Sequence, residues 1–113
     1  MAETPKRDEI PPGTLYMLIL KMLARHGRLH GYEIANAIQD VSDEVLQVEE
    51  GSLYPALQRM LLKGWVTAEW GVTAANRRAR YYRPTAAGRK QLLAEVAIYQ
   101  RVNGAIHKIL QTA

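Results

Sequence analysis

The chain has 113 residues, of which 48% are hydrophobic and none is cysteine. This length suits a single globular domain. The lack of cysteine excludes disulfides, thiolate metal sites and a cysteine nucleophile, and it suits a reducing, cytoplasmic environment. The longest apolar stretch, residues 15–24, is interrupted by Lys21 and is far shorter than the roughly 20 residues that cross a bilayer, so we expect no membrane span.

The net charge of +4 is unevenly distributed along the chain. Residues 51–90 contain eight Lys and Arg residues and a single acidic residue, a net charge of +7, whereas residues 1–50 carry −4 and residues 91–113 carry +1. A basic block inside an ordered unit is typical of a surface that meets phosphates. The alternative is a solvated cationic surface without a partner.

The first helix is predicted to follow a polar N-terminal segment. Residues 1–13 contain proline and lack the apolar centre of a secretory signal, so we expect a flexible arm. A helix then begins at Leu15 and ends at Gly27. It is apolar on all sides, which is typical of a helix that is buried on more than one side. Because a small domain offers little to cover it, we expect a second copy of the chain to contact Tyr16 and Leu20.

Two further helices are predicted before residue 65. The second begins at Gly31 and has an apolar face that ends with Val41. The third begins at Gly51 or Ser52, whose hydroxyl can cap it, and ends at Gly64. Its outer arc is polar and basic, and holds Ser52, Pro55, Gln58, Arg59, Leu62 and Lys63, with Tyr54 on the flank.

A hairpin and a long final helix complete the chain. Residues 65–70 and 78–83 alternate in the manner of β-strands. In the second strand, one face displays Arg78, Arg80 and Tyr82. The final helix is predicted to be capped by Thr85, and its apolar residues recur every three or four positions, as in a seam that packs against another helix. With Tyr16 and Leu20, the predicted dimerisation residues are Leu92, Val96, Tyr99, Val102, Ile106 and Ile109.

This order predicts a fold that is mainly α with a small β-hairpin. Two helices, a capped third helix and a hairpin over residues 14–84 indicate a winged helix-turn-helix, and residues 85–113 form a long C-terminal dimerisation helix. In such a fold the third helix enters the major groove of double-stranded DNA, while the wing touches the backbone or the minor groove.

Five blocks of the sequence support the same conclusion. They are HGYEI at residues 30–34, GSLYPALQR at 51–59, GW at 64–65, RRARYYR at 77–83 and TAAG at 85–88. These blocks resemble the PadR family of winged-helix transcriptional regulators, in its short form with one C-terminal helix. The resemblance implies a homodimeric bacterial repressor that reads an inverted-repeat operator with its two third helices, and whose binding is often modulated by a small molecule or a metal.

The candidate DNA-binding residues come from the third helix, the wing and one tyrosine of the second helix. They are Tyr32, Ser52, Tyr54, Gln58, Arg59, Lys63, Arg77, Arg78, Arg80 and Tyr82. Gln58 suits adenine and Arg59 suits guanine, but Arg59 can equally hold a phosphate. Ser52 can contact a phosphate, act only as a cap, or do both.

A ligand-sensing module is the alternative function. In a dimer, Tyr99 with Val96 and Val102 could line a slot for a small planar aromatic effector, although a fully packed interface is the simpler interpretation. RNA binding is a third hypothesis. We expect no metal, because Gly27 and Gly31 interrupt the spacing of His26 and His30.

Neither a cofactor nor catalysis is expected, because no catalytic motif is present. Trp65 and Trp70 are expected in the core rather than on a cofactor platform.

Overall fold

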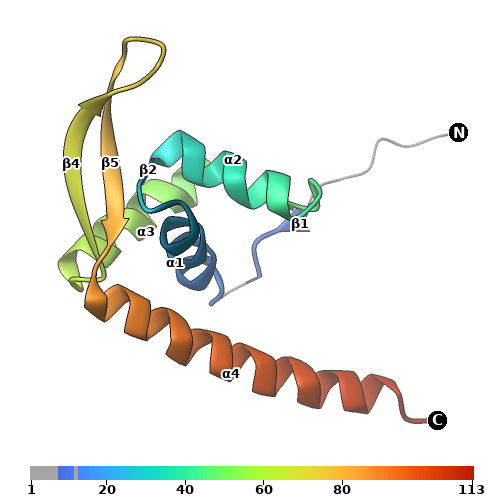
Figure 1. Cartoon of the computed structure of the whole chain (residues 1–113). Helices are drawn as coiled ribbons and strands as arrows, with labels where there is room; N and C mark the ends of the chain where they lie inside the picture. Colours follow the sequence, from blue (N-terminus) through green and yellow to red (C-terminus); the bar gives the residue numbers. More distant parts are fainter. Residues whose placement is uncertain (1–7, 12) are drawn as a thin grey trace, which may run out of the picture.

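The computed structural model describes residues 8–11 and 13–113. Four helices and a β-hairpin follow one another as predicted (Figure 1). The elements are α1 (Leu15–His26), α2 (Gly31–Val41), α3 (Glu50–Leu62), β4 (Val66–Val72), β5 (Arg78–Pro84) and α4 (Ala86–Leu110), with the two-residue strands β1 (Asp8–Glu9), β2 (Leu29–His30) and β3 (Leu46–Gln47). No helix in these described ranges is long and apolar enough to cross a membrane.

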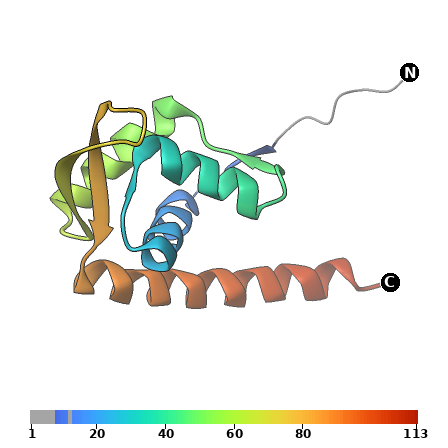
Figure 2. The same cartoon turned by 45° about the horizontal axis from the view of Figure 1, so that its top comes forward.

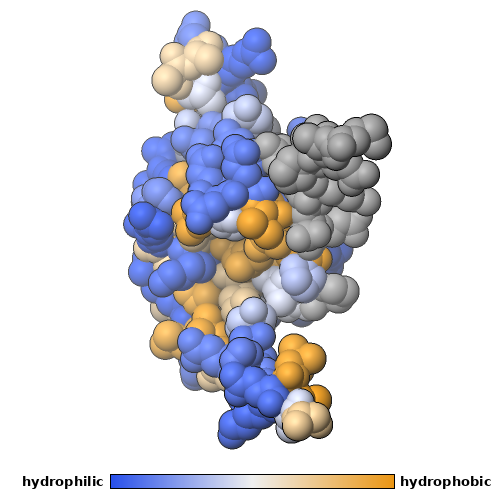
Figure 3. Space-filling model, turned by 90° about the vertical axis from the view of Figure 1, so that its right-hand side faces the viewer, coloured by the Kyte–Doolittle hydropathy of each residue, from blue (hydrophilic) through white to orange (hydrophobic). Residues whose placement is uncertain are grey.

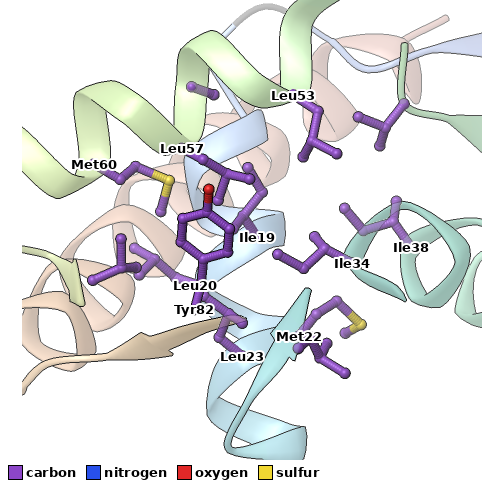
Figure 4. Packing of buried hydrophobic residues seen from close by; sticks show 14 of the residues in the cluster. Ile19, Leu20, Met22, Leu23, Ile34, Ile38, Leu53, Leu57, Met60 and Tyr82 are labelled. Atoms are coloured by element: carbon purple, nitrogen blue, oxygen red, sulfur yellow. The ribbon is translucent and has the colours of Figure 1, made fainter. Parts of the chain in front are cut away.

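Helix α1 is the centre of the core. It contacts α2, α3, α4 and β5, so its several apolar sides are covered within one chain. Figure 4 shows Ile19, Leu20 and Leu23 of α1 among side chains from the neighbouring elements. Leu20 is only 1% exposed, and its predicted contact with a second copy is therefore wrong. The reason is that α4 and β5 of the same chain pack onto α1, with Gly88 of α4 beside Leu20.

The sheet contains one strand more than the predicted hairpin. Its order is β2-β5-β4, and all neighbours are antiparallel. Strand β2 pairs Leu29 with Tyr82 and His30 with Tyr81. Two residues are too short to show a periodicity, so the sequence pattern could not reveal this strand.

Two residues that the sequence placed on buried faces are exposed. Val41 is 53% exposed at the end of α2, and Trp70 is 61% exposed on the wing. Val41 is the last residue of α2, and β4 is buried only at its first residue, Val66, so that both side chains lie away from the core. Trp65, in contrast, packs against the core, with its ring 5.5 Å from that of Tyr16 in an edge-on arrangement.

Part of the predicted N-terminal arm is attached to the body. Strand β1 pairs in parallel with β3, and Ile10 packs against the core. The arm is thus anchored at residues 8–10, because Ile10 finds an apolar site beside the segment that leads into α3. The rest of the predicted arm, residues 1–7 and Pro12, lies outside the described residues.

Helix α4 is clamped to the body at its first turn. The Thr85 hydroxyl donates to the Gly64 carbonyl at 2.6 Å and accepts from the Gly88 N–H at 3.0 Å, which confirms the predicted cap. A Cβ atom on Gly88 would lie only 2.0 Å from the Trp65 carbonyl oxygen. Beyond Leu92 and Val96 the helix leaves the body, as Figure 2 shows, and residues 97–110 are exposed.

We expect Gly88→Ala to destabilise the chain by about 3 kcal/mol, the upper end of the usual cost of overpacking, because the obstacle is a backbone oxygen. Gly104→Ala on the exposed part of the same helix is the matched control. Its Cβ meets nothing within 4 Å, so helix propensity should stabilise it by up to about 1 kcal/mol. Urea unfolding followed by circular dichroism measures both effects, and equal stabilities would contradict the proposed clamp.

Candidate nucleic-acid interface

Helix α3 presents one buried and one exposed face. The buried residues are Leu53, Ala56, Leu57 and Met60. The exposed residues include all the predicted contacts of this helix, namely Ser52, Tyr54, Gln58, Arg59 and Lys63. The periodicity therefore assigned the outer face of α3 correctly.

The start of α3 differs from the prediction. The helix begins at Glu50, and its N-cap residue is Glu49, which makes no side-chain cap bond. Ser52 lies inside the first turn, so its predicted role as the cap is wrong. The earlier start is favourable because the Glu50 carboxylate lies near the positive end of the helix dipole. Two carboxylates at this end also oppose a phosphate there, which disfavours the phosphate contact expected of Ser52.

Arg59 and Gln58 differ in how they are held. The Arg59 Nε donates a hydrogen bond to the Tyr16 hydroxyl, and its guanidinium lies 5.7 Å from the centre of the Tyr16 ring. Arg59 is therefore drawn toward α1. The side chain of Gln58 makes no hydrogen bond to the described part of the chain.

The wing has two faces with different electrostatics. On one face the Arg78 guanidinium lies 4.5 Å from the centre of the Trp70 ring. Arg80 is paired with Trp70 across the ladder. No carboxylate within the described residues forms an ion pair with Arg77, Arg78 or Arg80.

On the opposite face of the wing, one carboxylate neutralises two arginines. Glu69 lies 3.6 Å from Arg28 and 3.4 Å from Arg83. The Arg28 guanidinium also lies 4.0 Å above the centre of the Tyr81 ring. Gly71 permits this packing, because a Cβ there would lie 2.8 Å from both side chains. The face with Arg78 and Arg80 is therefore the more positive of the two.

Tyr82 does not belong to the exposed wing, contrary to the prediction. It is only 5% exposed, and Figure 4 shows its ring among Leu20, Leu57 and Met60. Burial raises the pKa of its hydroxyl, while the charge of Arg80 and a hydrogen bond to it act in the opposite direction. Alternation places Tyr82 on the face of Arg78 and Arg80, but nearer the body, where the helices cover that face. Tyr82 therefore supports the site from the core.

A cleft of about 780 Å³ separates the wing from the first turns of α2 and α3. Aromatic rings and arginines dominate its lining, which includes Tyr32, Tyr54, Trp70, Arg77, Arg78, Arg80 and Tyr81. Tyr32 is 66% exposed and Tyr54 is 48% exposed. Tyr54 packs so closely on Gly31 that a Cβ atom there would lie 2.8 Å from its ring. The cleft thus brings the predicted wing arginines together with Tyr32 of α2 and Tyr54 of α3, whereas Ser52, Gln58, Arg59 and Lys63 lie outside it.

His30 has a role that the sequence reasoning missed. The His30 ring Nδ1 accepts from the backbone N–H of Glu33 at 3.4 Å, and the backbone N–H of His30 donates to Glu33 Oε1 at 3.1 Å. This reciprocal pair caps α2. A glutamate three residues after the N-cap residue was the signal available in the sequence, and a histidine in the place of the usual serine or threonine obscured it.

Comparison with known proteins agrees with this architecture. Residues 19–94 match the transcriptional regulator PadR-like family. The chain belongs to this family. It is 31% identical over 86 residues to an uncharacterized protein of Lysinibacillus sphaericus, a match that covers 76% of this chain and 78% of the relative.

Solved structures of regulators superimpose well on the chain. A transcriptional regulator from Clostridium thermocellum is 28% identical with a TM-score of 0.79, covering 88% of this chain and 95% of that one. A PadR family regulator from Eggerthella lenta is 28% identical with a TM-score of 0.73, covering 89% and 85%. A PadR-like regulator from Bacillus cereus is 25% identical with a TM-score of 0.75, covering 89% and 95%. The winged-helix fold of this PadR-like regulator is therefore shown.

The two wing faces predict opposite effects on the salt dependence of DNA binding. Arg80→Ala should flatten the slope of log K against log salt by about one, because one phosphate contact is lost. Glu69→Gln should steepen that slope and raise the affinity for any duplex, because Arg28 and Arg83 are released. Asp40→Asn, an equal change of charge on exposed α2, controls for net charge. Fluorescence anisotropy over a range of salt concentrations measures the slopes; equal slopes for Glu69→Gln and Asp40→Asn would contradict the release of the arginines.

Proposed function

We propose that the chain is a sequence-specific double-stranded DNA-binding regulator that acts as a homodimeric repressor on an inverted-repeat operator in the cytoplasm. One observation carries the proposal. Tyr54, on the exposed side of α3, lines one cleft together with the unpaired arginines of the wing, Arg77, Arg78 and Arg80. This arrangement lets a helix enter the major groove while the wing follows the adjacent backbone.

The residues divide into readers and anchors. Gln58 is unengaged and is the primary reader of a base, with adenine as its preferred partner. Arg59 reads guanine when it turns away from Tyr16, and holds a phosphate when it stays. The phosphate anchors are Lys63, Arg77, Arg78 and Arg80, and the hydroxyls of Tyr32 and Tyr54 assist them.

We expect Gln58→Ala and Arg59→Ala to relax base preference at particular operator positions by about 1 to 3 kcal/mol. Arg77→Ala should weaken the binding of all sequences alike, because a phosphate contact carries no sequence information. Selection of bound sequences from a random duplex pool measures these preferences, and single strands and RNA serve as competitors. Selected duplexes that share no common sequence, or stronger binding to RNA than to duplex DNA, would count against the proposal.

The proposed homodimer rests on the free part of α4. Tyr99, Val102, Ile106 and Ile109 form a row on one side of the helix and are 45%, 49%, 50% and 68% exposed. Hydrophobic atoms are visible between the body and α4 and at the end of α4 in Figure 3. An apolar row on a helix is stable in water when a partner covers it. Leu92 and Val96 already pack within the chain, so the interface consists mainly of the later residues, with the exposed edge of Tyr16.

We expect Ile106→Glu to convert the dimer into monomers, because a carboxylate would be buried without a partner in an apolar interface. Operator affinity should fall severely, since the two subunits then bind their half-sites independently of each other. Ala97→Glu introduces the same charge on the other side of the exposed helix and should leave the dimer intact. Sedimentation equilibrium measures the mass, and a dimeric Ile106→Glu variant would contradict the proposed interface.

A small-molecule effector is the second candidate function. Tyr99 and Val102 keep about half of their surface exposed in one chain, so two copies can wall a slot for a planar aromatic compound, bounded by Val96. Such a ligand shifts DNA affinity only when it binds two arrangements of the dimer unequally. Titration of planar aromatic compounds against the wild type and Tyr99→Ala tests this role. Binding unchanged by the substitution would exclude this slot.

A further inference from the structure

We propose that Trp70 is a DNA-contacting residue whose indole packs against a deoxyribose of the strand that lies in the cleft between the wing and α3. The inference rests on the proposed function and adds a contact of a different chemical kind. The other proposed anchors act through charge or through hydroxyl groups. Trp70 offers an apolar surface to the sugar between two phosphates.

The exposure of Trp70 is the first observation. The ring is 61% exposed, although a tryptophan side chain contributes a large hydrophobic gain when it is buried. The other tryptophan of the chain, Trp65, packs against the core. Trp70 also faces a cleft lined by arginines and tyrosines, so its surroundings differ from the apolar patch that a protein partner would cover.

The position of Trp70 among the arginines is the second observation. Arg80 is its partner across the ladder, and Arg78 stacks on its ring at 4.5 Å. These two arginines are two positions apart on one strand, roughly 6.5 Å along its axis. In a nucleic-acid strand each sugar lies between two phosphates. An aromatic ring in contact with Arg78 and directly across the ladder from Arg80 therefore suits a sugar whose neighbouring phosphates are bound by these two arginines.

The stacking of Arg78 on Trp70 leaves its hydrogen-bonding capacity available. The donors of a guanidinium lie in its plane, and a cation–π contact uses its face. No carboxylate in the described chain competes for these donors. Arg78 can therefore bind a phosphate with its own donors while part of the Trp70 ring stays free for the sugar.

The contact has a signature that distinguishes it from an electrostatic one. Packing on a sugar releases no counterion and reads no base. We expect Trp70→Ala to weaken the binding of every duplex by about tenfold at all salt concentrations, a size typical of aromatic contacts to nucleic acids. The salt slope should stay that of the wild type. Trp70→Phe keeps a ring and should keep most of the affinity.

The experiment uses the full-length chain. In a Trp65→Phe background Trp70 is the sole indole, and its emission should change when operator duplex is added. Affinities of Trp70→Ala, Trp70→Phe and Arg78→Ala are measured by anisotropy from low to high salt. Val72→Ala, which removes another exposed apolar side chain of β4, should bind like the wild type. Circular dichroism verifies the fold of each variant.

Each outcome decides between the two proposals. Constant Trp70 emission together with wild-type affinity of Trp70→Ala would overturn this inference alone, provided that the wild type binds duplex DNA. A Trp70→Ala variant with the flattened slope of Arg78→Ala would also overturn it, because Trp70 would then act only by holding Arg78. Failure of the wild type to bind any duplex would overturn the proposed function itself.

Discussion

The close approach of Gly88 to the Trp65 carbonyl is the constraint on which the rest of the structure depends. A side chain at Gly88 would collide with that oxygen, and the bonds of Thr85 to Gly64 and Gly88 fix the same corner. Helix α4 is therefore held rigidly against the end of α3 and the base of the wing. In a dimer formed through α4, this corner would set the spacing of the two α3 helices and hence the spacing of the half-sites.

Charge is organised around the wing rather than spread over the surface. Glu69 neutralises Arg28 and Arg83 on one face, so the other face, with Arg78 and Arg80, dominates the local field. The Glu49 and Glu50 carboxylates lie at the start of α3, at the far end from Arg59 and Lys63. This gradient orients the domain, because phosphates are attracted to the wing and to the end of α3 and are repelled from its start.

The core and the interface share residues, so that stability and recognition are coupled. Tyr16 of α1 holds Arg59, and Tyr82 lies in the core two residues along β5 from Arg80. Tyr54 depends on the absence of a side chain at Gly31. A change in the packing of α1 is therefore expected to move the residues that we propose to contact DNA.

The sequence by itself determined the order of the elements, the family and the outer face of α3. Periodicity and capping residues such as Thr85 are local, and the basic residues are countable along the chain. Only the tertiary structure decided which wing residues are buried, because alternation assigns Tyr82 to the face of Arg78 and Arg80 but does not say how far along the strand the helices cover that face. It also decided that α4 and β5 cover Leu20, that β2 joins the sheet and that Glu69 pairs two arginines. Each of these depends on contacts between residues far apart in sequence, which no local pattern specifies.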